Sequence, residues 1–132
     1  MAAVLDTHAA IWYLMESDRL SPNALRIIEE STQSGDPVYL PSICLVEVIY
    51  LVEKGRVPFE ALEKLLSTLK TGDSAILVAP LDFDVAEEVR QVSRDAVPDM
   101  PDRIIAATAR NPGLPLVTRD HELQGLGIQT IW

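Results

Sequence analysis

Two kinds of hydrophobic pattern alternate along this chain of 132 residues. The first kind is a short apolar run rich in Val, Ile and Leu without strict alternation, which is typical of strands buried on both faces of a parallel sheet. These runs predict strands at residues 2–5, 38–40, 75–79, 115–118 and 128–131. The second kind has helical periodicity and predicts helices over residues 7–15, 22–33, 42–54, 58–70, 83–95 and 101–110.

The alternation of strands and helices indicates an α/β fold. Turn sequences such as SGDP at 34–37 and NPG at 111–113 separate the elements. We therefore expect a three-layer α/β/α domain with a central, mainly parallel sheet of about five strands and right-handed crossovers. With 48% hydrophobic residues, the chain can fill one core, and we expect a single domain over residues 1–132.

The charge balance limits how such a domain could bind nucleic acid. A net charge of −9 argues against a basic face that grips phosphates regardless of sequence. It leaves a nucleic-acid enzyme open, because acids gathered around bound cations reverse the local sign of the charge.

The first residues argue against a secreted or membrane protein, and the only cysteine argues against a redox enzyme. The apolar start MAAVLDTHAAIWYLM has no positive leader, and Asp6 and His8 interrupt it before it reaches the length of a signal peptide or membrane span. We therefore expect a soluble cytoplasmic protein. Cys44 lies between Ile43 and Leu45, so we expect a buried, inert thiol and no redox chemistry.

Two acids follow predicted strands closely. Asp6 comes after the first strand in VLDTH, and Asp120 comes after the fourth in LVTRDHEL. Both should lie at the carboxyl edge of the sheet, where α/β proteins bind ligands. Each also has an ordinary explanation, since Asp6 could cap the next helix and Asp120 could belong to a turn before a short helix.

Glu47 lies in an unusually apolar helix. It falls in PSICLVEVIYLV, where Ser42 is a plausible N-cap and the side chains three or four positions from Glu47 include Ile43 and Tyr50. A carboxylate on such a stretch loses hydration unless a cation or several hydrogen-bond donors receive it.

The segment DMPDRIIAATA at 99–109 opens an alanine-rich helix with two acids. Asp99 suits the N-cap, Pro101 the first turn, and Asp102 the third helical position. Ile105 and Ala106 share the face of Asp102, which places this acid at the rim of the core.

Coulomb energies favour a bound cation if these acids meet. Two carboxylates about 4 Å apart repel by roughly 4 kcal/mol at an effective dielectric near 20. A helix N-terminus returns only about 0.3–1 kcal/mol. Carboxylates without a nearby cysteine or a paired histidine suit Mg²⁺ or Mn²⁺, and His8 and His121 are too far apart in sequence to form such a pair.

Four motifs together resemble the PIN-domain family, specifically the VapC-type ribonuclease toxins of bacterial toxin–antitoxin pairs. The resemblance covers the whole chain through VLDTHAAIW, LPSICLVEV, DMPDRIIAATA and PLVTRD. It implies the sheet order 3-2-1-4-5. The pair DMPD departs from members that place proline directly after the first aspartate.

The resemblance also implies roles for individual residues. Asp6, Glu47, Asp102 and Asp120 match the family's catalytic, metal-binding acids, and Asp99 matches a further acid found nearby in many members. Two hydroxyls, of Thr118 and Thr7, would support the site. Next to site acids, Arg103 and Arg119 are candidates to contact phosphate.

The implied activity is Mg²⁺- or Mn²⁺-dependent endoribonuclease cleavage. One or two ions would bind the scissile phosphate and activate a water for in-line attack, and the family precedent implies products with 5′-phosphate and 3′-hydroxyl ends. The resemblance further implies a cognate antitoxin partner and a homodimer.

Two alternatives come from other classes. The first is a catalytically silent PIN-fold module whose apolar segment CLVEVIYLVEKGRV and helix 58–70 bind a protein partner. The second is a phosphotransfer domain with Asp6 as nucleophile. Haloacid-dehalogenase-type phosphatases place a second aspartate where this chain has His8, and the lysine that receiver domains need after a late strand is absent.

Overall fold

The computed structural model describes residues 1–71 and 75–132. Its five strands form one sheet in the order β3-β2-β1-β4-β5, and every neighbouring pair is parallel. The strands are β1 (Ala3–Leu5), β2 (Val38–Pro41), β3 (Ile76–Ala79), β4 (Leu116–Val117) and β5 (Thr130–Ile131). The expected fold class and strand order are confirmed.

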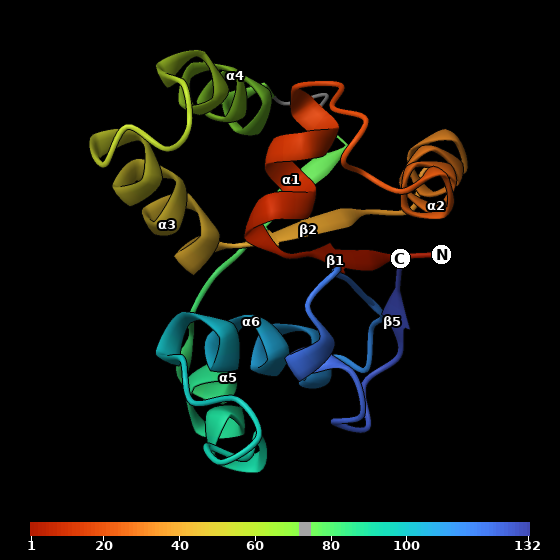
Figure 1. The fold of residues 1–132 in the computed structure, drawn as a ribbon. Helices are drawn as coiled ribbons and strands as arrows, with labels where there is room; N and C mark the ends of the chain where they lie inside the picture. Colours follow the sequence, from red (N-terminus) through yellow and green to blue (C-terminus); the bar gives the residue numbers. More distant parts are fainter. Residues whose placement is uncertain (72–74) are drawn as a thin grey trace.

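Six α-helices within the described residues cover the two faces of the sheet (Figure 1). Their bounds are α1 (Thr7–Leu14), α2 (Pro22–Gln33), α3 (Ser42–Glu53), α4 (Phe59–Lys70), α5 (Phe83–Glu88) and α6 (Met100–Arg110). In Figure 1, α1 and α4 lie above the central strands, α3 lies to their left, and α5 and α6 lie below them. None of the described helices combines the length and apolar character needed to cross a bilayer.

The strand order creates a crevice at the centre of the sheet. The chain moves outward from β1 to β2 and β3, and then crosses back to β4 on the other side of β1. Because parallel crossovers are right-handed, this reversal places α5 and α6 on the opposite face from the earlier helices. Ligands of open α/β sheets bind beside such a reversal, at the carboxyl ends of the strands. Here those ends belong to β1 and β4.

The core explains why the strands lack polar alternation. Val4 and Leu5 of β1 and Leu116 and Val117 of β4 are almost fully buried, since helices cover both faces of the central strands. The inward face of α6 includes Ile105, which is also almost fully buried. The predicted placement of that helix face is confirmed.

Two local predictions were wrong. The helix expected at 83–95 ends early, because α5 passes at Glu88 into a single 3₁₀ turn, η1 (Val89–Gln91). Ser42 is not an N-cap. The capping position is Pro41, without a side-chain hydrogen bond, and the Ser42 hydroxyl instead accepts a hydrogen bond from the backbone N–H of Leu81. A serine inside the first turn thus ties α3 to the segment that follows β3.

Candidate metal centre

A cavity of about 540 Å³ opens at the carboxyl ends of β1 and β4. Five carboxylates line it, and they come from separate parts of the chain: Asp6, Glu47, Asp99, Asp102 and Asp120. The structure therefore brings the four acids selected from the sequence, and the secondary one, to one place.

Asp6 occupies the junction between β1 and α1. Its backbone N–H donates to the Val117 carbonyl (3.1 Å), which extends the pairing of β1 with β4 by one bond. One carboxylate oxygen caps α1 by accepting from the Ala9 N–H at 2.8 Å, and the other accepts from the Thr118 hydroxyl at 2.5 Å. Capping and a place at the cavity thus coexist in one side chain.

Thr118 connects Asp6 to Asp120. Its side chain is fully buried. Its hydroxyl oxygen accepts a hydrogen bond from the Asp120 backbone N–H at 3.0 Å, and its hydroxyl group donates a hydrogen bond to Asp6. Asp120 then caps a 3₁₀ turn, η2 (His121–Leu123), by accepting from the Glu122 N–H at 2.9 Å. A continuous hydrogen-bonded chain therefore fixes the two acids that follow β1 and β4.

Glu47 reaches the cavity from the middle of α3. The buried Thr7 hydroxyl donates to its Oε1 atom at 2.6 Å. This bond crosses from α1 to α3 and fixes the direction of the carboxylate. The second carboxylate oxygen accepts no hydrogen bond from a described residue.

Asp99 and Asp102 occupy the start of α6 as expected from the sequence. Asp99 is the N-cap and accepts from the Asp102 N–H at 3.1 Å, while Pro101 fills the first turn. Asp99 is exposed and Asp102 is half-buried. The capping carboxylate is thus directed to its own helix, and Asp102 is turned toward the other acids.

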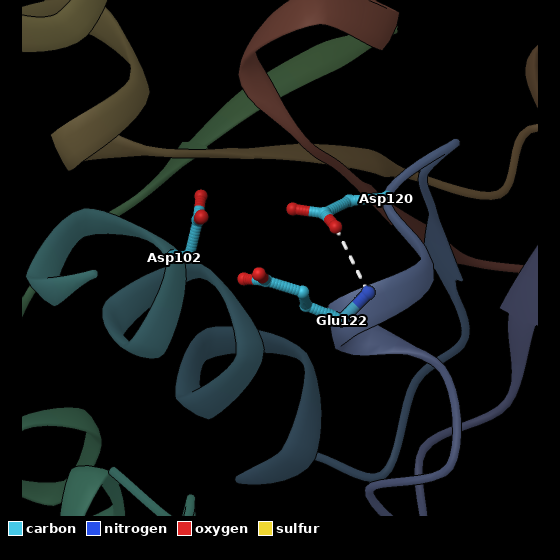
Figure 2. Close-up of side chains that lie close together, drawn as sticks. All are labelled: Asp102, Asp120 and Glu122. Carbon is cyan, nitrogen blue, oxygen red and sulfur yellow. Dashed lines mark hydrogen bonds between the residues drawn. The ribbon is translucent and has the colours of Figure 1, made fainter. Parts of the chain in front are cut away.

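The tightest carboxylate group includes a residue that sequence reasoning missed. Asp102, Asp120 and Glu122 each present an oxygen, and these three atoms lie within 4.8 Å of one another. Figure 2 shows the side chain of Glu122 extending from η2 toward α6, the side chain of Asp102 rising from α6, and the carboxylate of Asp120 on the other side of the gap between them. The available signal was only the closeness in sequence of Glu122 to Asp120, because a 3₁₀ turn has three residues per turn and does not by itself bring positions two apart to the same side.

Burial and mutual repulsion disfavour charge on these acids. Desolvation, followed by the charges of Asp99 and Asp120, raises the pKa of Asp102 from 3.8 to about 7. Desolvation likewise raises the pKa values of Asp6 and Glu47, although the hydroxyls of Thr118 and Thr7 act in the opposite direction. Holding all these carboxylates ionised together requires a source of positive charge.

The donor set fits a hard divalent cation. In the described residues, none of the cavity carboxylates forms an ion pair with Lys or Arg. Oxygen atoms on opposite sides of a cation lie about 4–5 Å apart, since Mg–O and Ca–O distances are about 2.0–2.6 Å. The spread of 4.8 Å within the Asp102, Asp120 and Glu122 group is compatible with that requirement.

The two arginines selected from the sequence have different positions relative to the cavity. Arg103 turns away from the cavity, and its guanidinium donates to the carbonyls of Val89 (2.9 Å) and Val92 (3.1 Å). Those bonds satisfy the end of η1, so a phosphate contact by Arg103 is not retained. Arg119 does line the cavity, with its guanidinium 5.0 Å from the centre of the Trp12 ring.

The remaining reactive side chains are one buried cysteine and two exposed histidines. Cys44 is buried, and desolvation raises the pKa of its thiol far above the ordinary range, in agreement with the predicted inert role. His121 is exposed as expected. His8 is the second residue of α1, is exposed, borders the carboxylate cavity, and has its ring 5.4 Å from that of Trp12.

A parallel α/β sheet with acids converging at its topological switch point defines an acidic-site α/β domain of the kind that holds divalent cations. Residues 3–128 match the PIN-domain family model. The chain belongs to the PIN-domain family, which confirms the resemblance drawn from the four motifs. Over 121 residues it is 30% identical to ribonuclease VapC22 of Mycobacterium tuberculosis, an alignment that spans 92% of this chain and 88% of the relative.

Solved structures share the whole fold. A chain in the crystal structure of VapBC2 from Rickettsia felis, bound to a DNA fragment from its promoter, superposes with a TM-score of 0.73. It is 15% identical, over 98% of this chain and 97% of that one. DNA-bound VapBC from Salmonella typhimurium gives a TM-score of 0.68 at 23% identity, over 98% and 96% of the two chains. At these identities the likeness concerns the fold.

Proposed function

We propose that this protein is a Mg²⁺- or Mn²⁺-dependent endoribonuclease and the toxin component of a type II toxin–antitoxin pair. The observation that carries the proposal is the convergence of Asp6, Glu47, Asp102 and Asp120 on one cavity at the switch point of a PIN fold. The 30% identity to a protein named as a ribonuclease supports the reaction class.

Three of the carboxylates are the proposed direct cation ligands: Asp6, Asp102 and Asp120. Glu47 completes or orients this set, and Asp99 contributes from its outer edge. When bound, the cation supplies positive charge to the scissile phosphate and lowers the pKa of the attacking water. We add Glu122 to the proposed set because its carboxylate lies with those of Asp102 and Asp120.

The surrounding hydroxyls keep the proposed ligands ionised and oriented. Thr118 and Thr7 each donate their only hydroxyl proton to a site carboxylate, which favours the charged form that a cation requires. Partners of this kind fix ligand direction, and their removal typically weakens metal binding by about 10–100-fold.

Purified protein and a structured RNA test this function. We expect cleavage in Mg²⁺ or Mn²⁺, no cleavage in excess EDTA, and a loss of at least about 100-fold in Asp102→Asn, because one ligand charge disappears. Asp95→Asn is the matched control, since Asp95 is exposed and lies outside the cavity. Equal cleavage with EDTA, or full activity of Asp102→Asn, would refute the proposal.

A protein partner and a second copy belong to the same proposal. A structural neighbour from Klebsiella pneumoniae is described as a toxin–antitoxin complex, which supports a cognate antitoxin for this chain. Large apolar side chains remain exposed on α3 and at the start of α4, namely Val46, Tyr50 and Phe59. We infer that this surface contributes to a homodimer or antitoxin contact in the cytoplasm.

The runner-up is a catalytically silent PIN-fold module that uses the same apolar surface. It predicts a protein stabilised by Mn²⁺ that cleaves no RNA. The retention of every family acid favours the enzyme, because a module released from catalysis has no need to keep five carboxylates together against their repulsion.

A further inference from the structure

Two arginine side chains border the same cavity as the acids, although the chain as a whole is strongly negative. The chain has 20 Asp and Glu against 11 Lys and Arg, yet Arg19 and Arg119 both border the carboxylate cavity. They come from opposite ends of the chain: Arg19 lies between α1 and α2, and Arg119 lies two residues after the end of β4. The fold thus brings two cations to the rim of an acidic site.

Neither guanidinium group is paired with another described side chain or carbonyl. Among residues 1–71 and 75–132, the guanidinium groups of Arg19 and Arg119 take part in no ion pair or hydrogen bond. Both residues are exposed. Beside five carboxylates, an arginine held only by electrostatics would be expected to form an ion pair. The unpaired N–H donors are therefore available to an anionic ligand.

Trp12 provides the reason why Arg119 stays apart from the acids. The guanidinium lies 5.0 Å from the centre of the Trp12 ring, an arrangement worth about 0.5–1 kcal/mol at exposed sites. Trp12 is only 9% exposed, and its ring lies near those of Trp132 and His8 at centroid distances of 5.8 Å and 5.4 Å. A fixed aromatic platform thus orients the cation along the cavity wall.

The loop that carries Arg19 is also defined. Its backbone N–H donates to the Ser17 hydroxyl at 3.1 Å, and the Leu20 N–H donates to the Ser17 carbonyl at 3.3 Å. Leu20 is buried, so this turn is anchored to the core. Arg19 is consequently presented from a fixed turn on the α1 side of the cavity.

We propose that Arg19 and Arg119, the latter positioned by Trp12, form a phosphate-binding wall that holds the RNA backbone beside the carboxylate centre. The proposal rests on the proposed function for its choice of RNA. Cations bound by the carboxylates would serve the phosphate that is cleaved, whereas the neighbouring phosphates need separate positive groups. Arginine is suited to that task, because its planar fork pairs with two phosphate oxygens.

RNA binding in the absence of cleavage tests the wall. The fluorescence anisotropy of a short labelled single-stranded RNA would be measured in EDTA over a range of salt concentrations. We expect Arg119→Gln and Arg19→Gln each to raise the Kd by about five- to tenfold and to reduce the salt slope by about 0.7, the value for one phosphate contact on a single strand. The control Arg94→Gln removes the same charge from an exposed position outside the cavity, and it should stay within about twofold of wild type.

A pair of tryptophan variants tests the positioning role. Trp12→Leu removes the aromatic face and should reproduce the salt slope of Arg119→Gln, whereas Trp12→Phe keeps a face and should recover most of the binding. Circular dichroism identifies a misfolded variant, and Arg119→Gln still tests the wall in that case because its side chain is exposed.

Three results would overturn the wall. The first is a change in the Kd for RNA that is no larger in Arg119→Gln and Arg19→Gln than in Arg94→Gln. The second is a wild type that does not bind RNA at low salt. The third is tighter Mn²⁺ binding by Arg119→Gln with unaltered RNA affinity, which would mean that Arg119 only offsets the carboxylates. Cleavage in Mg²⁺ is scored separately: arginine-dependent binding without cleavage supports the wall and refutes the nuclease.

Discussion

Replacing Asp102 by asparagine should stabilise the protein when no metal is present. The substitution preserves the size of the side chain and leaves the backbone N–H that Asp99 caps in place. Desolvation and four neighbouring carboxylates raise the pKa of Asp102 from 3.8 to about 7. A raised pKa means that the folded protein disfavours the ionised form. The resulting penalty is absent below about pH 4, grows between about pH 4 and pH 7, and is complete above that range.

The size of the effect follows from the same pKa. At 1.36 kcal/mol for each tenfold change in proton affinity, the rise from 3.8 to about 7 corresponds to roughly 4 kcal/mol. Asp102 is only half-buried, and solvent screening reduces the expected gain for Asp102→Asn to about 1–2 kcal/mol. For a domain of this length, that gain raises Tm by about 3–8 °C.

Thermal unfolding followed by circular dichroism measures the gain. At pH 8 in EDTA, Asp102→Asn should melt above wild type, and the difference should shrink at pH 5, where Asp102 of the wild type is mostly protonated. Saturating Mn²⁺ at pH 8 should reverse the order, because a ligand at about 100 times its Kd stabilises wild type by about 2.7 kcal/mol. Asp95→Asn controls for net charge and should stay within about 0.5 kcal/mol of wild type. An Asp102→Asn variant that is less stable than wild type at pH 8 in EDTA would refute the conclusion that desolvation and repulsion destabilise the ionised Asp102.

Three other predictions concern single side chains. Glu122→Gln should weaken Mn²⁺ binding by at least about tenfold in a calorimetric titration, and unaltered affinity would remove Glu122 from the proposed ligand set. Thr7→Val removes a hydrogen bond that lowers the pKa of Glu47, so protons compete better and Mn²⁺ affinity should fall more at pH 6 than at pH 8; an equal loss at both pH values would contradict this role. Cys44 should react with Ellman's reagent only after unfolding, and rapid labelling of the folded protein would contradict its burial.

The main features of the fold could be predicted because the apolar runs in the sequence correspond to strands that are buried on both faces. Apolar runs such as that of β1 indicated strands covered on both faces, and the helices between them required a parallel sheet. The strand order came from the family resemblance, since spacing alone does not decide which side of β1 a later strand occupies. The early end of α5 could not be predicted, because the Arg103 side chain that satisfies the carbonyls of Val89 and Val92 comes from another helix, α6.

The candidate site was predictable where an acid was anchored to an element. Asp6 and Asp120 follow strands, and Asp102 has a fixed position in the first turn of α6. Glu122 escaped prediction because its approach to Asp102 depends on the direction of a short 3₁₀ turn. Arg119 has the same kind of dependence, since the Trp12 ring that positions it lies more than 100 residues earlier in the chain.

Mapping RNA 5′ ends in cells that produce this protein tests the central claim most directly. Wild type should generate new 5′-phosphate ends at discrete positions, and Asp102→Asn, produced at an equal level, should generate at least about tenfold fewer. The asparagine variant keeps the side-chain size and the backbone N–H that Asp99 caps while removing one proposed ligand charge, so the comparison tests the carboxylate centre. The same ends at the same abundance from both proteins would contradict a metal-dependent nuclease built on these acids.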